Sequence, residues 1–166
     1  NFNGLVQKSI MMMLYTLKVG LRLKLEHQEL VQHTLAAMLH HLGMAMVPIK
    51  TRHKVDTLTN EELELIKQSP ERAVVYLRSC HVDNTFLLSA ITQAAERYDG
   101  SGPGGLSGRE IVWPARIIGL LSMFEALIHF RHYRPRLLPR DAIRTLVNHH
   151  KKAFDPEVLR ALIESI

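Results

Sequence analysis

The chain has 166 residues, of which 46% are hydrophobic and 22% are charged, a composition that fits one folded domain and excludes a disordered chain. The single cysteine, Cys80, excludes an internal disulfide and a cysteine-based zinc site, so a reducing, cytoplasmic setting is expected. The net charge of +5 suits an anionic partner, and a basic solvated surface explains it equally well.

Apolar residues recur at helical spacing along almost the whole chain, and no alternating pattern indicates a strand. We therefore expect an all-α fold, a helical bundle of about seven to eight helices. No apolar run reaches the roughly 18 residues that a membrane-spanning helix needs, so no membrane insertion is expected. Met11, Met12 and Met13 in the first helix favour core packing, with an adaptable interaction surface as the second interpretation.

The ends of the expected helices follow from capping residues and breakers. Gly43 is typical of a helix C-terminus, and Thr59 with Glu62 forms a capping box. A loop rich in Lys, Arg and His is expected over residues 47–56, and a Gly-rich connection over residues 99–108. The helices are expected over residues 5–25, 28–42, 59–69, 71–80, 84–98 and 114–129, after Pro139, and from about Asp155 onwards.

Three segments carry motifs in a fixed order. Residues 36–43 read AAMLHHLG, residues 58–70 read LTNEELELIKQSP, and residues 96–102 read ERYDGSG, with GLSG following over residues 105–108. Together they resemble the HD-GYP family of the HD superfamily, whose active members are metal-dependent cyclic di-GMP phosphodiesterases. Further matches follow at residues 114–118, 124–127, 131–134 and 154–156. The resemblance is clearest over residues 30–166 and implies an HD-domain fold.

The resemblance also implies metal-ligand positions, and this chain departs from the family at most of them. His40-His41 stands in place of the family's His-Asp pair, Ser69 in place of a His before Pro, Ala94 and Ala95 in place of an adjacent His pair, and Ser122 in place of an Asp. Only His40 keeps a ligand, and one imidazole does not hold a binuclear centre. We therefore expect no cofactor; the alternative is one or two divalent transition metals held by substitute ligands such as His33.

The loop that names the family is altered as well. Gly102 is followed directly by Pro103, so the Tyr of the Gly-Tyr-Pro motif is missing. In relatives this loop is linked to contacts with diguanylate cyclase (GGDEF) domains, and the deletion puts that role in question. The residues of the signature loop are Arg97, Tyr98, Asp99, Gly100, Gly102 and Pro103.

Residues 129–140 concentrate arginine and histidine. Guanidinium groups bind phosphate through two hydrogen bonds, so this segment is a candidate contact for an anion or a partner, although a solvated loop is the simpler explanation. The candidate contact residues are Arg131, Tyr133, Arg134 and Arg136.

The favoured hypothesis is a catalytically inactive HD-GYP-like domain over residues 1–166, part of a longer regulator, that acts in bacterial signal transduction by binding. The expected partner is a protein or a neighbouring regulatory domain, with a cyclic dinucleotide and a second copy in a homodimer as further candidates. Two alternatives stay open. One is a metal-dependent cyclic di-GMP phosphodiesterase that uses substitute ligands, and the other is a basic domain that associates with nucleic acid.

Overall fold

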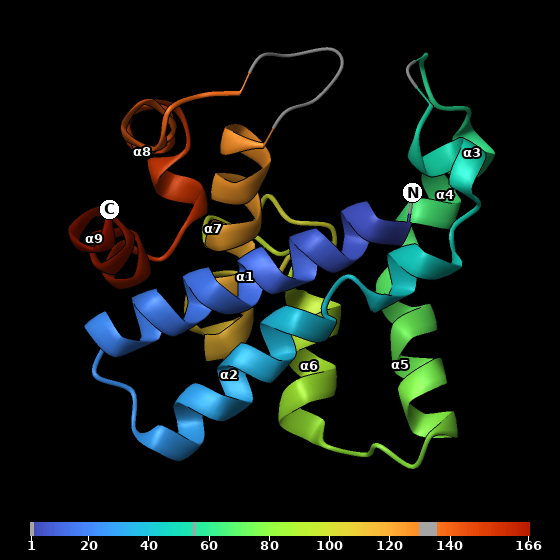
Figure 1. Cartoon of the computed structure of the whole chain (residues 1–166), viewed down its shortest axis with the longest axis horizontal. Helices are drawn as coiled ribbons and strands as arrows, with labels where there is room; N and C mark the ends of the chain where they lie inside the picture. Colours follow the sequence, from blue (N-terminus) through green and yellow to red (C-terminus); the bar gives the residue numbers. More distant parts are fainter. Residues whose placement is uncertain (1, 55, 130–135) are drawn as a thin grey trace.

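The computed structural model describes residues 2–54, 56–129 and 136–166, and every element in these ranges is helical (Figure 1). The expected all-α class is therefore confirmed, with one isolated bridge between Asp99 and Ser107 in the described ranges. The α-helices are α1 (Phe2–Arg22), α2 (His27–Leu39), α3 (Ile49–Arg52), α4 (Asn60–Lys67), α5 (Ser69–Ser79), α6 (Thr85–Gln93), α7 (Trp113–Ile128), α8 (Pro139–His149) and α9 (Pro156–Ser165). The 3₁₀ helices are η1 (Leu42–Met46), η2 (Gly108–Glu110) and η3 (Lys151–Ala153).

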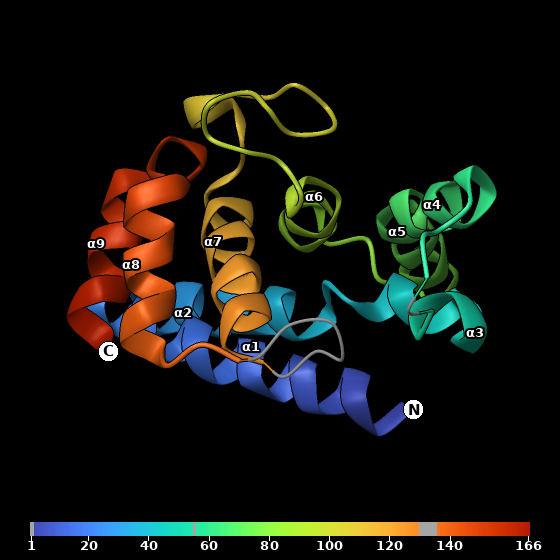
Figure 2. The ribbon, with the colours of Figure 1, turned by 90° about the horizontal axis from the view of Figure 1, so that it is seen from above.

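Helix α7 lies at the centre of the molecule. Most of its residues are buried, because α1, α2, α6, α8 and α9 all pack against it. Figure 2 shows α8 and α9 side by side on one flank of α7, while α3, α4 and α5 gather at the opposite end of the molecule. The core therefore brings together the ends of helices that are far apart in the sequence.

Several helix ends differ from the sequence prediction. Helix α1 stops at Arg22 because Lys24 adopts a positive φ of 57°. Helix α2 stops at Leu39, and Gly43, expected as its C-terminal stop, lies inside η1 instead. The expected loop 47–56 contains the short α3, which is the one α-helix beyond the eight expected.

Other local predictions are confirmed. The Thr59 side chain accepts a hydrogen bond from the Glu62 amide, while the Glu62 carboxylate accepts one from the Thr59 amide, as a capping box requires. Met12 is fully buried, and its neighbours Met11 and Met13 are half-buried, so core packing is the main role of this segment. Within the described ranges, no helix combines the length and the apolar character needed to cross a membrane.

Candidate functional site

The first candidate position, His40, caps the C-terminus of α2 and is 8% exposed. Its Nδ1 lies 2.6 Å from the carbonyl oxygen of Ala37, and this short contact favours a proton on Nδ1 that is donated to the carbonyl. Its Nε2 is buried and has no hydrogen-bond partner among the described residues. The ring stacks on that of His41, with the two centroids 3.7 Å apart. His40 is thus a packed residue whose second nitrogen meets no donor.

The surroundings of His40 disfavour its charged form. Burial is the main cause and lowers the pKa of His40 to about 4, and the nearby ammonium of Lys8 acts in the same direction. The hydrogen bond with Ala37 opposes these effects and is weaker than burial. The imidazole is therefore neutral near pH 7.

The cation beside His40 comes from α1. The Lys8 Nζ lies 3.5 Å from Oε2 of Glu125, a carboxylate on α7 that is only 2% exposed. The His129 Nδ1 lies 3.4 Å from the other oxygen of the same carboxylate. The contact between the Lys8 Nζ and Oε2 of Glu125 is an ion pair without hydrogen-bond geometry. A side-chain ammonium therefore supplies positive charge next to the position of the family's first histidine ligand.

The remaining ligand positions carry small side chains on the elements that meet here. Ser69 is buried at the start of α5, directly against η1: a Cβ added to Gly43 would lie 1.6 Å from the Ser69 carbonyl oxygen. Ala94 ends α6, and its carbonyl oxygen would lie 3.1 Å from a Cβ at Gly119 of α7. These two close backbone contacts fill space between the helix ends.

Ala95 and Ser122 complete the set of positions. Ala95 is exposed, and Ser122 is half-buried on α7, three residues before Glu125. The methyl groups of Ala94 and Ala95 have no donor atom, so they cannot replace an imidazole as a metal ligand.

The donor set does not fit the metal centre that the family implies. Among the described residues, no group of three or more His, Cys, Asp or Glu side chains lies close enough to hold a metal ion. His33, the substitute ligand considered from the sequence, is buried, directs Nδ1 to the Glu29 carbonyl oxygen at 2.7 Å, and packs its ring edge-on against Phe86. We therefore derive no chemical step that passes through a metal.

The signature loop is organised around Glu96, which the sequence analysis did not single out. Glu96 is 8% exposed, and its carboxylate accepts hydrogen bonds from the amides of Gly104 at 2.7 Å and Leu106 at 3.2 Å. A Cβ at Gly102 would lie 2.6 Å from the Glu96 Cα, so glycine is required there. These contacts explain why α6 ends at Gln93 rather than near residue 98: the chain turns so that Glu96 faces the loop.

The other loop residues are brought together by local bonds. Arg97 donates to the carbonyl oxygens of Ala95 and Glu96, both at 3.0 Å, and burial lowers its pKa. Asp99 accepts bonds from the Ser101 hydroxyl at 2.7 Å and amide at 3.1 Å, which lower its pKa. The Tyr98 amide donates to Ala153 at 2.9 Å, which fastens the loop to η3.

Glycine is also needed at the turn that follows, where Gly100 has a φ of 81°. Pro103, at the position after the missing tyrosine, is exposed. The loop therefore keeps its framework of internal bonds without that tyrosine.

The arginine-rich segment lies mostly outside the described residues. Arg131, Tyr133 and Arg134 belong to residues 130–135, so their predicted roles stay predictions. Arg136 is described and exposed. Nothing in the described part brings it to His40.

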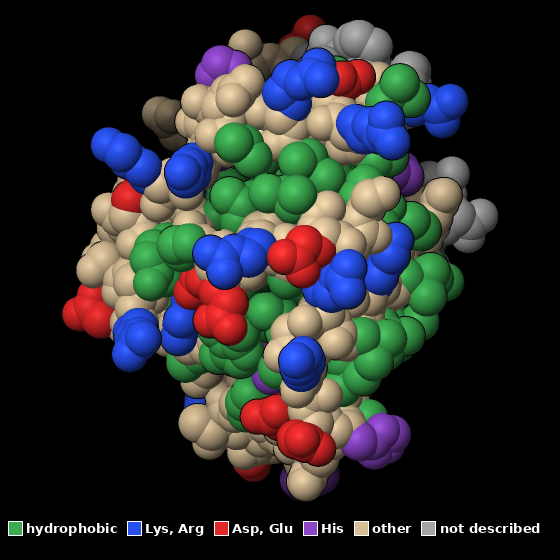
Figure 3. All heavy atoms as spheres, turned by 90° about the vertical axis from the view of Figure 1, so that its left-hand side faces the viewer, with side chains coloured by type: hydrophobic (Ala, Val, Ile, Leu, Met, Phe, Trp, Pro, Cys, Tyr) green, Lys and Arg blue, Asp and Glu red, His purple; other side chains and the backbone are tan. Residues whose placement is uncertain are grey.

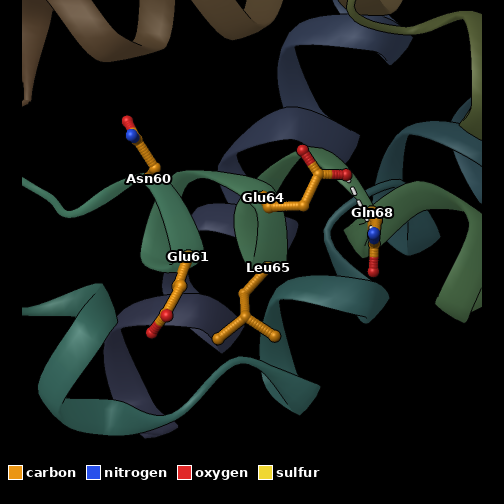
Figure 4. A pocket seen from close by; sticks show the side chains of 5 residues that line it. All are labelled: Asn60, Glu61, Glu64, Leu65 and Gln68. Atoms are coloured by element: carbon orange, nitrogen blue, oxygen red, sulfur yellow. Dashed lines mark hydrogen bonds between the residues drawn. The ribbon is translucent and has the colours of Figure 1, made fainter.

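A separate hollow of about 580 Å³ lies on α4, and its lining contains none of the predicted site residues. Figure 4 shows the Glu64 carboxylate turned towards Gln68, whose side-chain amide donates to it at 2.8 Å. The Glu61 and Glu64 carboxylates of this hollow are both exposed, so we do not assign the candidate site to it. The residues lining this hollow are Asn60, Glu61, Glu64, Leu65 and Gln68.

The family model for the HD domain matches residues 2–158, almost the whole chain. Cyclic di-GMP phosphodiesterase PdeB of Borreliella burgdorferi is 30% identical over 152 residues, which are 91% of this chain and 40% of that protein. The response regulator RpfG of Xanthomonas campestris, also named a cyclic di-GMP phosphodiesterase, is 32% identical over 149 residues, or 87% of this chain and 39% of that protein. The chain belongs to the HD-GYP family of HD domains.

The fold of this HD-GYP domain agrees with a solved structure, that of Bd1817, an HDGYP protein from Bdellovibrio bacteriovorus. The two share a TM-score of 0.78 at 19% identity over 96% of this chain and 51% of that one. The chain spans about two fifths of the length of the curated relatives it matches. The match from residue 2 extends the resemblance into α1, which the sequence motifs did not cover.

Three residues of the site were missed from the sequence: Lys8, Glu96 and Glu125. A signal existed for Glu125, because a lone carboxylate inside the apolar run of α7 needs a partner when it is buried. No sequence signal links it to Lys8, which lies 117 residues earlier. For Glu96, the signal was its position just before the Gly-rich segment 99–108, whose backbone amides need hydrogen-bond acceptors.

Proposed function

We propose that this HD-GYP domain does not hydrolyse cyclic di-GMP and that it acts in bacterial signal transduction by binding a protein partner or a neighbouring regulatory domain. One observation carries the proposal: Ser69, Ala94 and Ser122 stand where the family has ligands, while the Lys8 ammonium, paired with buried Glu125, is near enough to help lower the pKa of His40. A fixed cation there disfavours a divalent cation by electrostatic repulsion.

The chemical consequence follows from how the family's reaction is catalysed. Bound metals generate a hydroxide near neutral pH and neutralise the charge that develops on the phosphoryl group. No described side chain here replaces both effects. A neutral imidazole with a pKa of about 4 is also a weak general base.

A second candidate is a phosphodiesterase with substitute ligands, and it is supported by the names of the relatives, several of which are cyclic di-GMP phosphodiesterases. The experiment that separates the two is a cyclic di-GMP hydrolysis assay on the purified domain, without added metal and with Mn²⁺ or Fe²⁺. We expect no turnover above the protein-free rate under any condition. Turnover that disappears in His40→Ala would overturn the proposal in favour of the phosphodiesterase.

Calorimetric titration with cyclic di-GMP on the same protein asks whether the nucleotide still binds as a ligand. Binding without turnover places the cyclic dinucleotide among the regulators of the domain. Absence of binding leaves protein contact as the proposed role.

A further inference from the structure

The flank formed by α8, η3 and α9 carries a hollow of about 830 Å³, which we call the α8–α9 groove. It lies away from His40, and it touches the signature loop only at Tyr98 and Asp99. Its apolar lining is mostly aliphatic and includes Val147 from α8 with Leu159 and Ile163 from α9. Four of its lining residues lie in segments that match the family, and none of the four is a position at which the resemblance implies a metal ligand: Tyr98, Asp99, Phe154 and Pro156.

The apolar stripe of α9 is wider than the core requires. Val158, Leu159 and Leu162 are buried, whereas Ile163 on the same helix and Ile166 directly after its end are each 44% exposed. Figure 3, seen from the side of Figure 1 on which α8 and α9 lie, shows a band of apolar side chains bordered by Lys and Arg and also by Asp and Glu side chains. An exposed apolar surface with a charged rim is typical of an interaction site.

The charge around the groove has one dominant sign. Lys151 and Lys152 follow α8, and Arg160 lies on α9; all three are exposed, and within the described residues none forms an ion pair. Among the described residues that line the groove, the one carboxylate is Asp99, and it already accepts two bonds from Ser101. The rim therefore offers three cations that form no ion pair with the described part of the chain.

A second, polar hollow of about 410 Å³ adjoins the groove and carries charges of both signs. It shares Tyr98, Pro156 and Arg160 with the groove and adds the exposed Arg109 together with two carboxylates, the buried Asp155 and the exposed Glu157. Arg116 lines this second hollow but is bound to Asp155 at 3.0 Å, so it is not available as a free cation.

We propose that the α8–α9 groove binds an acidic amphipathic helix of a partner protein, an inference that rests on the proposed function of this domain in binding. The aliphatic lining fits Leu, Ile or Met side chains spaced along one helix face, and the cations on η3 and α9 fit carboxylates that flank that face. A nucleotide fits less well, because two of the three cations are Lys, whose ammonium cannot bind phosphate through two parallel hydrogen bonds as the Arg guanidinium does. In addition, Tyr98 is the one aromatic side chain of the described lining that is not buried and could stack on a base.

The test uses a synthetic helical peptide with Leu at helical spacing flanked by Glu, and a matched peptide in which every Glu is Lys. Binding to the purified domain is measured by fluorescence anisotropy at low and high salt. We expect saturable binding of the acidic peptide only, weakened by salt. Ile163→Glu and the double variant Lys151→Glu/Lys152→Glu should each weaken it by about tenfold or more.

Matched controls carry the same changes outside the groove. Leu21→Glu replaces an apolar residue of α1 that is 62% exposed, and Lys18→Glu reverses an exposed lysine of α1. Both should bind the acidic peptide like the unchanged domain, and circular dichroism checks that every variant keeps its helical signal.

The proposal is overturned if the acidic peptide shows no saturable binding, or if the groove and control variants weaken it equally. It is also overturned if the groove variants abolish self-association or cyclic di-GMP binding instead, because a second copy or a nucleotide is then the occupant. The hydrolysis assay on the same preparations reports on the proposed function separately, because no groove residue occupies a family ligand position.

Discussion

At the scale of single residues, the site is defined by how the charge of Glu125 is balanced. A buried carboxylate is costly unless it is paired, and here the partners are Lys8 from α1 and His129 one turn further along α7. The family's metal ligands are replaced by neutral side chains, so the chain holds less buried negative charge where cations would otherwise lie. The ion pair also ties α1 to α7.

Replacing Lys8 with Met removes the ammonium that pairs with the Glu125 carboxylate and leaves the contact with the His129 imidazole among the described residues. We expect Lys8→Met to lower the free energy of unfolding by about 2 kcal/mol, less than for a fully buried pair because Lys8 is partly exposed. Urea denaturation measures this change. Lys18→Met, at an exposed position, serves as the control and should change stability by less than about 0.5 kcal/mol. A double variant with Glu125→Gln should recover part of the loss, and failure to recover contradicts the pairing.

The lowered pKa of His40 predicts a pH dependence of stability. Folded His40 titrates at about 4 and the unfolded residue near 6.5, so between these values the unfolded chain binds a proton that the folded one does not. Stability is therefore fully present above pH 6.5 and falls as the pH drops towards 4, by at most about 3 kcal/mol from this residue. Unfolding free energies measured from pH 7 to pH 4 should show a shallower slope for His40→Gln. His27→Gln, at an exposed position, should keep the original slope.

At the scale of elements, backbone contacts between helix ends position the site. Gly43 of η1 lies directly on the Ser69 carbonyl at the start of α5, and the Glu96 carboxylate holds the loop that follows α6. The first contact fixes the backbone of η1 against Ser69, and the second fixes the loop that follows Ala94 and Ala95.

Gly43→Ala tests the first of these contacts. The added methyl group would meet a backbone oxygen at 1.6 Å, which cannot move aside as a flexible side chain could. We expect a loss of about 3 kcal/mol in the free energy of unfolding. Gly4→Ala is the matched control: apart from the local helix backbone, none of the described atoms lies within 4 Å of its added Cβ, and alanine favours a helix, so stability should stay the same or rise slightly. Equal effects of the two changes would show that the η1–α5 contact is not tight.

The helices themselves could be predicted from the sequence, and their ends only in part. The capping box at Thr59 is a local signal and was found, as was the apolar stripe of α9. The end of α6 at Gln93 could not be predicted, because it depends on two hydrogen bonds that amides eight and ten residues further on donate to the Glu96 carboxylate. The four-residue α3 is too short to show a periodic pattern.

At the scale of the whole molecule, the domain keeps the fold of an HDGYP protein, with its helices packed around α7. The positions that the resemblance assigns to metal ligands follow from motif spacing and stay a prediction. The pairing of Lys8 with Glu125 could not be predicted, since it depends on how α1 crosses α7 (Figure 1). The α8–α9 groove could not be predicted from the sequence either, because its walls combine the end of one helix with the face of another.

The metal content of the purified domain tests the central claim most directly. Elemental analysis should find no stoichiometric iron, manganese or zinc, either as purified or after incubation with these metals and removal of the excess. The reason is that Ser69, Ala94, Ala95 and Ser122 stand at the family's ligand positions and the Lys8 ammonium lies beside His40. Two or more metal ions per chain, lost in His40→Ala, would contradict the account.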